Sequence, residues 1–220
     1  MLGPRPRNAT LTALLRRELV REEHPPTAAL IRGLAGVHLR GRFTRAEFRR
    51  MCEWKSPRAR HLWATNSPAR IRAVSRAVLA TRSERRRMEL LTGLHGVGIP
   101  IASAILTLVD PRRYGVLDIR AWQLLFSLRS VTANARGQGF TIAQWEQYLS
   151  ELRRHARQLR VSARTVEYTL FLCHRKFQRG LLYARSDRSK SSPRPRDAGR
   201  ARARPSGSGD ARRRPAAGRG

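Results

Sequence analysis

Apolar residues recur every three or four positions through most of the first 180 residues, as in the series Leu11, Leu14, Leu15 and Leu19. This spacing places side chains on one face of a helix, whereas a half-buried strand needs alternation, which no long stretch shows. The pattern predicts an all-α fold. The expected helices cover residues 9–22, 27–39, 44–53, 67–81, 84–94, 100–109, 118–128, 141–159 and 162–178.

Capping signals support several of these starts. Thr44 stands three residues before Glu47, which is the spacing of a capping box, and Ser67 precedes Pro68 at a first helical position. Thr141 can accept a hydrogen bond from a free amide in the same way. The helix boundaries are therefore predicted by the polar residues as well as by the apolar periodicity.

The composition changes near residue 183. Residues 1–182 have enough apolar content for one helical domain of one or two lobes, whereas residues 183–220 are rich in Arg, Pro, Ser, Gly and Ala. Such a segment cannot bury enough apolar surface to offset the entropy of ordering, so we expect a disordered basic tail. The tail either adds non-specific affinity for phosphates or is a passive product of base composition.

The chain carries a formal net charge of +31, and its sequence pI is about 12.0. An excess of this size indicates a polyanionic partner, and nucleic acid is the first candidate. Arginine supplies nearly all of the positive charge, since lysine stands only at positions 55, 176 and 190. A GC-rich genome that favours Arg codons is the alternative explanation.

The sequence has no pattern typical of a metal site, a disulfide, a signal peptide or a membrane span. Cys52 and Cys173 lie far apart and outside any metal-ligand spacing, so we expect no zinc site, disulfide, metal or other cofactor. Residues 1–7 lack the apolar core of a signal peptide, and no apolar run approaches a membrane span. The expected location is the cytoplasm, in association with the nucleoid.

A tight turn between two helices is predicted at residues 94–98, where Leu-His-Gly-Val-Gly precedes an Ala-rich apolar run. Glycine enters positive φ without strain, and we expect such a φ at Gly98. Amides at the start of the following helix would lack partners and would favour a phosphate oxygen. The residues expected to bind a DNA backbone are His95, Gly96, Val97 and Gly98.

This turn and Asp118, which follows Gly98 by 20 residues, resemble the hairpin and aspartate of the helix-hairpin-helix DNA glycosylases of the endonuclease III-like superfamily. The resemblance covers residues 90–128, and His95 replaces the family's usual hairpin proline. The segment at residues 54–58 is also similar to one in uncharacterised bacterial members. The resemblance implies a helix-hairpin-helix bundle that binds double-stranded DNA and excises bases.

In this superfamily the aspartate stabilises positive charge on the deoxyribose as the glycosidic bond breaks, or helps to activate water. The resemblance assigns this role to Asp118. A carboxylate suits the role because the sugar becomes oxocarbenium-like. Asp118 is also placed to cap the helix that follows, and in the family one aspartate can do both.

Members that also cut the strand carry a lysine two residues after the second hairpin glycine, where this chain has Pro100. Proline has no free amine and suits the first turn of a helix. The four-cysteine iron-sulfur loop of some members is absent as well. The resemblance therefore implies a monofunctional glycosylase that uses water and no cofactor.

Lys55 is the one lysine before the hairpin, and it lies in the segment Trp54-Lys55-Ser56-Pro57-Arg58. Lys55 and Arg58 either contact phosphate or face water, and Lys55 is the one alternative amine nucleophile. Trp54 is the best candidate to line a base pocket, because it adjoins a Ser-Pro break and a basic cluster. A position in the core is the alternative for each aromatic residue near the motif, namely Trp54, Trp63, Trp122 and Tyr114.

The sequence thus predicts a monomeric protein that binds double-stranded DNA and removes a damaged or mismatched base in base excision repair. Two alternatives remain open. One is a helix-hairpin-helix module that binds DNA without chemistry. The other is an RNA-associated basic protein, for which no grouping of Arg around the hairpin is expected.

Overall fold

The computed structural model describes residues 10–177, which form helices and contain no strand. The all-α prediction is confirmed for this part of the chain, and the predicted tail at 183–220 lies outside the described residues. The elements are α1 (Leu11–Glu18), α2 (Pro25–Gly33), α3 (Val37–Arg40), α4 (Arg45–Lys55), the 3-10 helix η1 (Pro57–Ala59), α5 (Arg60–Trp63), α6 (Pro68–Ala80), α7 (Glu84–Thr92), α8 (Ile99–Val109), α9 (Ile119–Ser127), α10 (Ile142–Leu159) and α11 (Ala163–Phe177).

The predicted helix 9–22 ends early, because α1 stops at Glu18, and other helix ends are shifted by a few residues. Two larger differences concern the number of helices. The predicted helix 27–39 is broken into α2 and α3, because the amides of Leu34 and Val37 bond carbonyls three residues back and the chain turns there. The short elements η1 and α5 were not predicted. A segment as short as residues 57–63 contains too few turns for an apolar period to appear.

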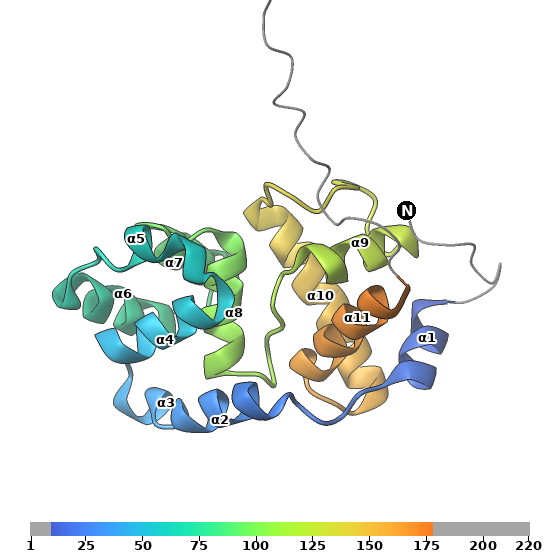
Figure 1. Cartoon of the computed structure of the whole chain (residues 1–220), viewed down its shortest axis with the longest axis horizontal. Helices are drawn as coiled ribbons and strands as arrows, with labels where there is room; N and C mark the ends of the chain where they lie inside the picture. Colours follow the sequence, from blue (N-terminus) through green and yellow to red (C-terminus); the bar gives the residue numbers. More distant parts are fainter. Residues whose placement is uncertain (1–9, 178–220) are drawn as a thin grey trace, which may run out of the picture. The chain divides into compact units, whose positions relative to one another are not determined.

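Helix α8 is buried on nearly every side. All residues from Ile101 to Leu108 are buried, since α8 packs against α4 and α7. Figure 1 shows α8 running beside the group formed by α4 to α7. This burial explains why the sequence of α8 is apolar all round rather than along one stripe.

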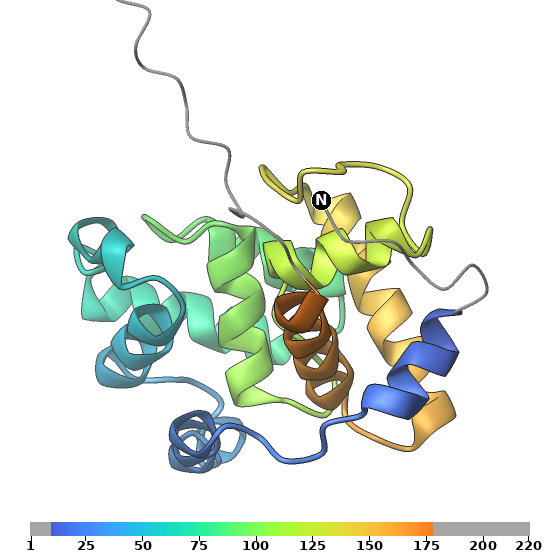
Figure 2. The same cartoon turned by 45° about the vertical axis from the view of Figure 1, so that its right-hand side comes forward.

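A second group of helices forms around α11. Helix α11 packs against α9 and α10, and α1 also packs against α11, although it comes from the other end of the described chain (Figures 1 and 2). Leu11, Leu14 and Leu15 bury the apolar face of α1. None of the described helices is both long enough and apolar enough to span a membrane.

The segment between α8 and α9 links the two groups and carries the candidate aspartate. The backbone amide of Leu117 donates to Oγ of Ser103 at 2.9 Å, and that of Val116 donates to the Glu167 carboxylate at 3.2 Å. A Cβ on Gly115 would lie 2.4 Å from Leu152, so the chain passes the second group closely. These contacts fix the backbone immediately before α9.

Candidate functional site

The turn between α7 and α8 contains one glycine in the left-handed region. Gly96 has a φ of 72°, and a Cβ there would lie 2.5 Å from Cβ of Leu62 and 2.7 Å from the backbone nitrogen of Trp63. Any side chain at position 96 would therefore be strained and would collide with α5. Close packing of the turn against α5 requires this glycine.

The expectation of a positive φ at Gly98 is wrong. Gly98 has φ −82° and ψ 172°, which is the extended backbone of an N-cap residue and is open to any amino acid. The nearest atom to a Cβ at this position is Cδ of Pro100, at 3.9 Å. The residue with positive φ is Gly96, two positions earlier.

Two of the four predicted backbone-binding residues use their amides inside the protein. The amide of His95 donates to Oδ1 of Asn66 at 3.0 Å, and the amide of Val97 donates to the carbonyl of Leu94 at 3.1 Å. The side chain of Val97 is buried in the core. These two residues shape the hairpin, and their amides are not available to a ligand.

The amides of Gly96, Gly98 and Ile99 donate no hydrogen bond to any residue between 10 and 177. Gly98 and Ile99 stand at the start of α8, where the positive end of the helix dipole adds to the donors. Gly98 is exposed. The hairpin therefore offers a set of donors suited to a phosphate oxygen.

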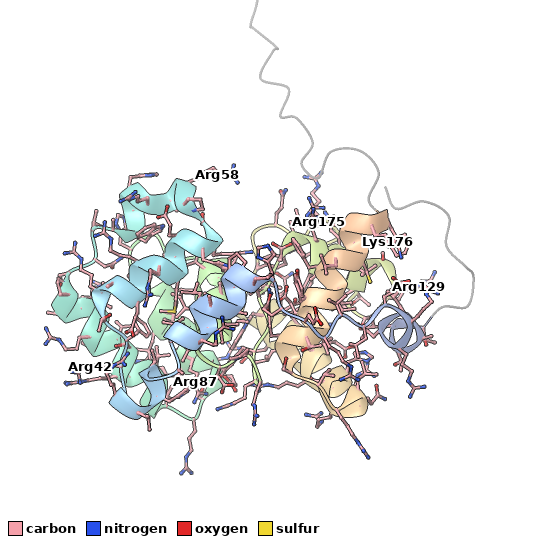
Figure 3. All side chains as sticks on the ribbon, turned by 60° about the horizontal axis from the view of Figure 1, so that its bottom comes forward. Arg42, Arg58, Arg87, Arg129, Arg175 and Lys176 are labelled. Carbon is pink, nitrogen blue, oxygen red and sulfur yellow. The ribbon has the colours of Figure 1, made fainter. Side chains whose placement is uncertain are left out.

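Asn66 joins the hairpin to α5, and sequence reasoning did not identify it. Its Nδ2 donates to the carbonyls of Trp63 and His95, at 2.9 Å each. This buried amide fixes the hairpin beside the segment that carries Arg58. Arg58 is exposed and projects from η1 (Figure 3).

Asp118 is the N-cap of α9 and contacts a lysine from a distant part of the chain. Its Oδ1 accepts a hydrogen bond from the amide of Arg120 at 2.9 Å. Its Oδ2 lies 2.9 Å from Nζ of Lys55, and the Lys55 and Asp118 side chains are 17% and 19% exposed. The structure thus brings together two of the candidate residues that stand 63 positions apart in the sequence.

The Asp118 carboxyl group is biased toward its ionised form. Burial acts to raise its pKa, but the charge and hydrogen bond of Lys55, together with the amide of Arg120, outweigh burial and lower the pKa. The site therefore keeps a partly buried carboxylate at neutral pH.

Lys55 reaches this position because it ends α4. The amide of Ser56 closes the helix on the carbonyl of Cys52, and the indole of Trp63 donates to the Ser56 carbonyl at 3.1 Å. The chain turns away into η1 at this point. Lys55 therefore lies between the hairpin-bearing group and the start of α9.

Lys55 and Asp118 line a cavity of about 240 Å³. Trp54 also lines it, and its indole donates to Oγ1 of Thr27 at 3.1 Å. The other aromatic residues near the motif are buried core residues, namely Trp63, Trp122 and Tyr114. The remaining cavity residues are His24, Val116, Arg164, Glu167, Tyr168, Phe171 and Arg175.

Arg164 holds one wall of the cavity together. Its guanidinium donates twice to Glu23, at 2.6 and 2.9 Å, and once to Glu167. It also lies 5.7 Å from the ring centre of Trp54 and 4.8 Å from that of Tyr168. Burial acts to lower the pKa of Arg164, but the two carboxylates raise it, so the guanidinium stays charged.

Helix α11 supplies five cavity residues that sequence reasoning missed, Arg164, Glu167, Tyr168, Phe171 and Arg175. Their separations of three, one, three and four positions are those of one helix face, so a polar and aromatic stripe was present in the sequence. Nothing in the sequence indicated that this face meets Lys55 and Asp118. Figure 3 shows Arg175 on α11, where it is exposed.

No group of three or more His, Cys, Asp or Glu side chains is arranged to hold a metal ion within the described part of the chain. Cys52 and Cys173 are buried free thiols. Burial raises the pKa of Cys52 to about 12 and that of Cys173 to about 11. Both thiols are therefore protonated and poorly reactive at neutral pH.

Comparison of the chain with protein-family models, with curated proteins and with solved structures found no match.

Proposed function

We propose that this chain is a DNA-binding enzyme of the helix-hairpin-helix glycosylase type, which removes a damaged or mismatched base from duplex DNA. The observation that carries the proposal is the position of Asp118, an ionised carboxylate that lines a cavity and follows a hairpin with free amides. The net charge of +31 supports a polyanionic substrate.

Asp118 performs the electrostatic part of the reaction. Cleavage of the glycosidic bond leaves positive charge on the sugar, and a fixed carboxylate stabilises that charge more than it stabilises the ground state. The bond from the Arg120 amide holds one carboxylate oxygen in place. Water then attacks the sugar and completes the hydrolysis.

The aromatic side chains of the cavity serve the base. An enzyme that acts on a base inside a duplex rotates the nucleotide out and stacks the base against aromatic or apolar groups. Trp54, Tyr168 and Phe171 supply such surfaces beside Asp118. The hairpin amides and Arg58 hold the phosphates on either side of the rotated nucleotide.

The cavity favours this proposal over a binding module without chemistry, because a module that only grips phosphates needs no recess beside Asp118. The hairpin also has arginine neighbours. Arg70 donates to the Gly93 carbonyl at 2.6 Å, and Arg58 lies on the segment fixed to the hairpin through Asn66. An RNA-associated or merely Arg-rich protein would not require this arrangement.

The proposal is tested by incubating the full chain with duplexes that each carry one lesion or mismatch, followed by hot alkali to break abasic strands. Breaks at one class of lesion are expected. Asp118→Asn should bind the same duplex but release the base at least about a hundredfold more slowly in single turnover. Tight duplex binding without base release would favour the binding module, and equal preference for RNA would favour the RNA-associated alternative.

A further inference from the structure

A group of arginines lies at the end of α8 that is farther from the hairpin. The segment that follows α8 meets the last turns of α10 there: the Arg153 guanidinium donates to the carbonyl of Arg113 at 3.0 Å, and the amide of Ala163 donates to the carbonyl of Arg112 at 3.1 Å. The arginine cluster consists of Arg112, Arg113, Arg153, Arg157 and Arg160.

One carboxylate organises the inner part of the arginine cluster. Glu84 accepts hydrogen bonds from Arg113 at 2.9 Å and from Arg153 at 2.7 Å. The same carboxylate pairs with Arg87 at 3.2 Å, and Asp110 lies 4.0 Å from Arg113. Two carboxylates thus face three guanidinium groups, so positive charge remains uncompensated while the side chains that carry it are held in place.

The outer arginines of the cluster have no carboxylate partner. Arg112, Arg157 and Arg160 are exposed, and none of them forms an ion pair with a residue between 10 and 177. Arg153, Arg157 and Arg160 follow one another at four and three positions, which places them on one face at the end of α10. The outer guanidinium groups are therefore open to an anion.

The backbone of Arg160 indicates that its side chain serves something other than the fold. Arg160 is the C-cap of α10, and its φ of 54° and ψ of 46° lie in the left-handed region where glycine is the usual residue. The dipole of α10 favours a cation at this end of the helix, but it does not require an arginine in a strained conformation.

The arginine cluster and the hairpin lie beyond opposite ends of α8. The 11 residues of α8 extend about 16 Å, with the hairpin before them and Arg112 and Arg113 after them. Figure 3 shows the same separation, with Arg58 at one edge of the structure and Arg87 at the opposite edge. A straight duplex that sits on the hairpin does not reach the cluster, which is therefore left for a different partner.

We propose that the arginine cluster is a second phosphate-binding surface, which holds a separate DNA segment while the hairpin holds the first. This inference rests on the DNA-binding part of the proposed function and goes beyond base removal. Guanidinium groups bind phosphate oxygens through paired N–H donors. The stripe from Arg153 to Arg160 rises about 10 Å, which matches about three successive phosphates of one strand.

Capture of a second duplex by the full chain tests the inference. An undamaged biotinylated duplex is fixed on beads and loaded with protein, unbound protein is washed away, and a fluorescent duplex of unrelated sequence is added. Wild type should retain the fluorescent duplex. Arg112→Gln/Arg157→Gln/Arg160→Gly should retain at least about fivefold less, and its log–log dependence of retention on salt should be shallower by about 2 to 3.

Arg16→Gln/Arg32→Gln/Arg50→Gln is the matched control. These three arginines lie on α1, α2 and α4, are exposed and form no ion pair with a described residue, so the control loses the same charge outside the cluster. It should retain as much fluorescent duplex as wild type. Both triple variants should bind the first duplex with equal affinity and show the wild-type circular dichroism spectrum.

Failure of this inference and failure of the proposed function give different results. Four outcomes would overturn the second surface: no retention by wild type, equal retention by the two triple variants, stronger retention of a single-stranded RNA than of the duplex, or a dimer of the free chain that the cluster variant loses. Cluster-dependent retention by a protein that releases no base would refute the glycosylase function and leave the second surface standing.

Discussion

Nζ of Lys55 lies 2.9 Å from Oδ2 of Asp118, although 63 residues separate them in the chain. Lys55 is the last residue of α4 and Asp118 is the N-cap of α9, so the pair joins the two groups of helices at the cavity. The ammonium of Lys55 helps to keep the Asp118 carboxylate ionised, and an ionised carboxylate can stabilise a cationic sugar. The proposed base removal depends on this ionised carboxylate.

The two hairpin glycines should respond differently to substitution. Gly96→Ala places a Cβ at positive φ and 2.5 Å from Leu62, so it should destabilise the fold by about 2 kcal/mol or more. Gly98→Ala meets no atom nearer than 3.9 Å and should change the free energy of unfolding by less than about 1 kcal/mol. Urea unfolding of both variants measures the difference.

Gly98→Asp extends this comparison to DNA. The extended backbone accepts aspartate, so the fold should persist, while the added negative charge repels phosphate and weakens duplex binding. Equal destabilisation by the two alanine variants would contradict the hairpin geometry. Unchanged duplex affinity of folded Gly98→Asp would contradict its role in binding.

Loss of Arg164 should be costly, because it leaves Glu167 buried without its cation. Arg164→Met should lower the free energy of unfolding by about 3 to 5 kcal/mol. Arg86 is the control, since its side chain is 60% exposed and its pair with Glu89 should contribute less than about 1 kcal/mol. Similar small losses of unfolding free energy for Arg164→Met and Arg86→Met in urea would contradict a stabilising role of the contacts between Arg164 and its two carboxylate partners.

The cavity should reject a base that carries a permanent positive charge. Arg164 lies over the rings of Trp54 and Tyr168, and Arg175 lies 5.8 Å from the ring centre of Phe171. These guanidinium groups would repel a cationic alkylated base, whereas a neutral base would not be repelled. Base release from neutral lesions should exceed release from cationic ones by at least about tenfold after correction for spontaneous loss, and the reverse order would contradict this view of the cavity.

The pH dependence of stability should reflect His174. Burial lowers its pKa to about 4, with a further contribution from Arg120, and its Nε2 lies 3.1 Å from Oε1 of Gln123. The imidazole of His174 takes up a proton near pH 6.5 in the unfolded chain but only near pH 4 in the folded chain. Its contribution to stability is therefore fully present above about pH 6.5 and is lost as the pH falls toward 4.

Between pH 6.5 and 4.5 this linkage should cost wild type about 2 kcal/mol more than it costs His174→Gln. Urea unfolding across this range measures the difference, because other titrating groups contribute to both proteins. Parallel pH profiles for the two proteins would show that His174 titrates normally.

Local features of the site were predictable from the sequence. The Ala-rich apolar run located α8, and polar residues marked the starts of α4, α6 and α10. Asp118 was recognisable as an N-cap because its side chain acts on an amide two residues away. Each of these features depends on interactions within a few residues of the chain.

The cavity was not predictable in the same way. Lys55 meets Asp118, and Arg164 meets Glu23, across 63 and 141 residues, and such contacts follow from how the helices pack. The position of the positive φ was also mistaken, because the close approach of α5 to Gly96 has no local signal. The site is assembled by helix packing, which local patterns in a single sequence do not reveal.

The most direct measurement compares the affinity of the full chain for two duplexes, one with a cationic pyrrolidine in place of the abasic sugar and one with a neutral tetrahydrofuran. The cationic ring imitates the charge that Asp118 is proposed to stabilise, and no knowledge of the lesion is needed. Wild type should bind the cationic duplex at least about tenfold more tightly, and Asp118→Asn should lose that preference while keeping its affinity for the neutral duplex. Equal affinity of wild type for the two duplexes, or a preference that survives in Asp118→Asn, would contradict the proposed role of Asp118.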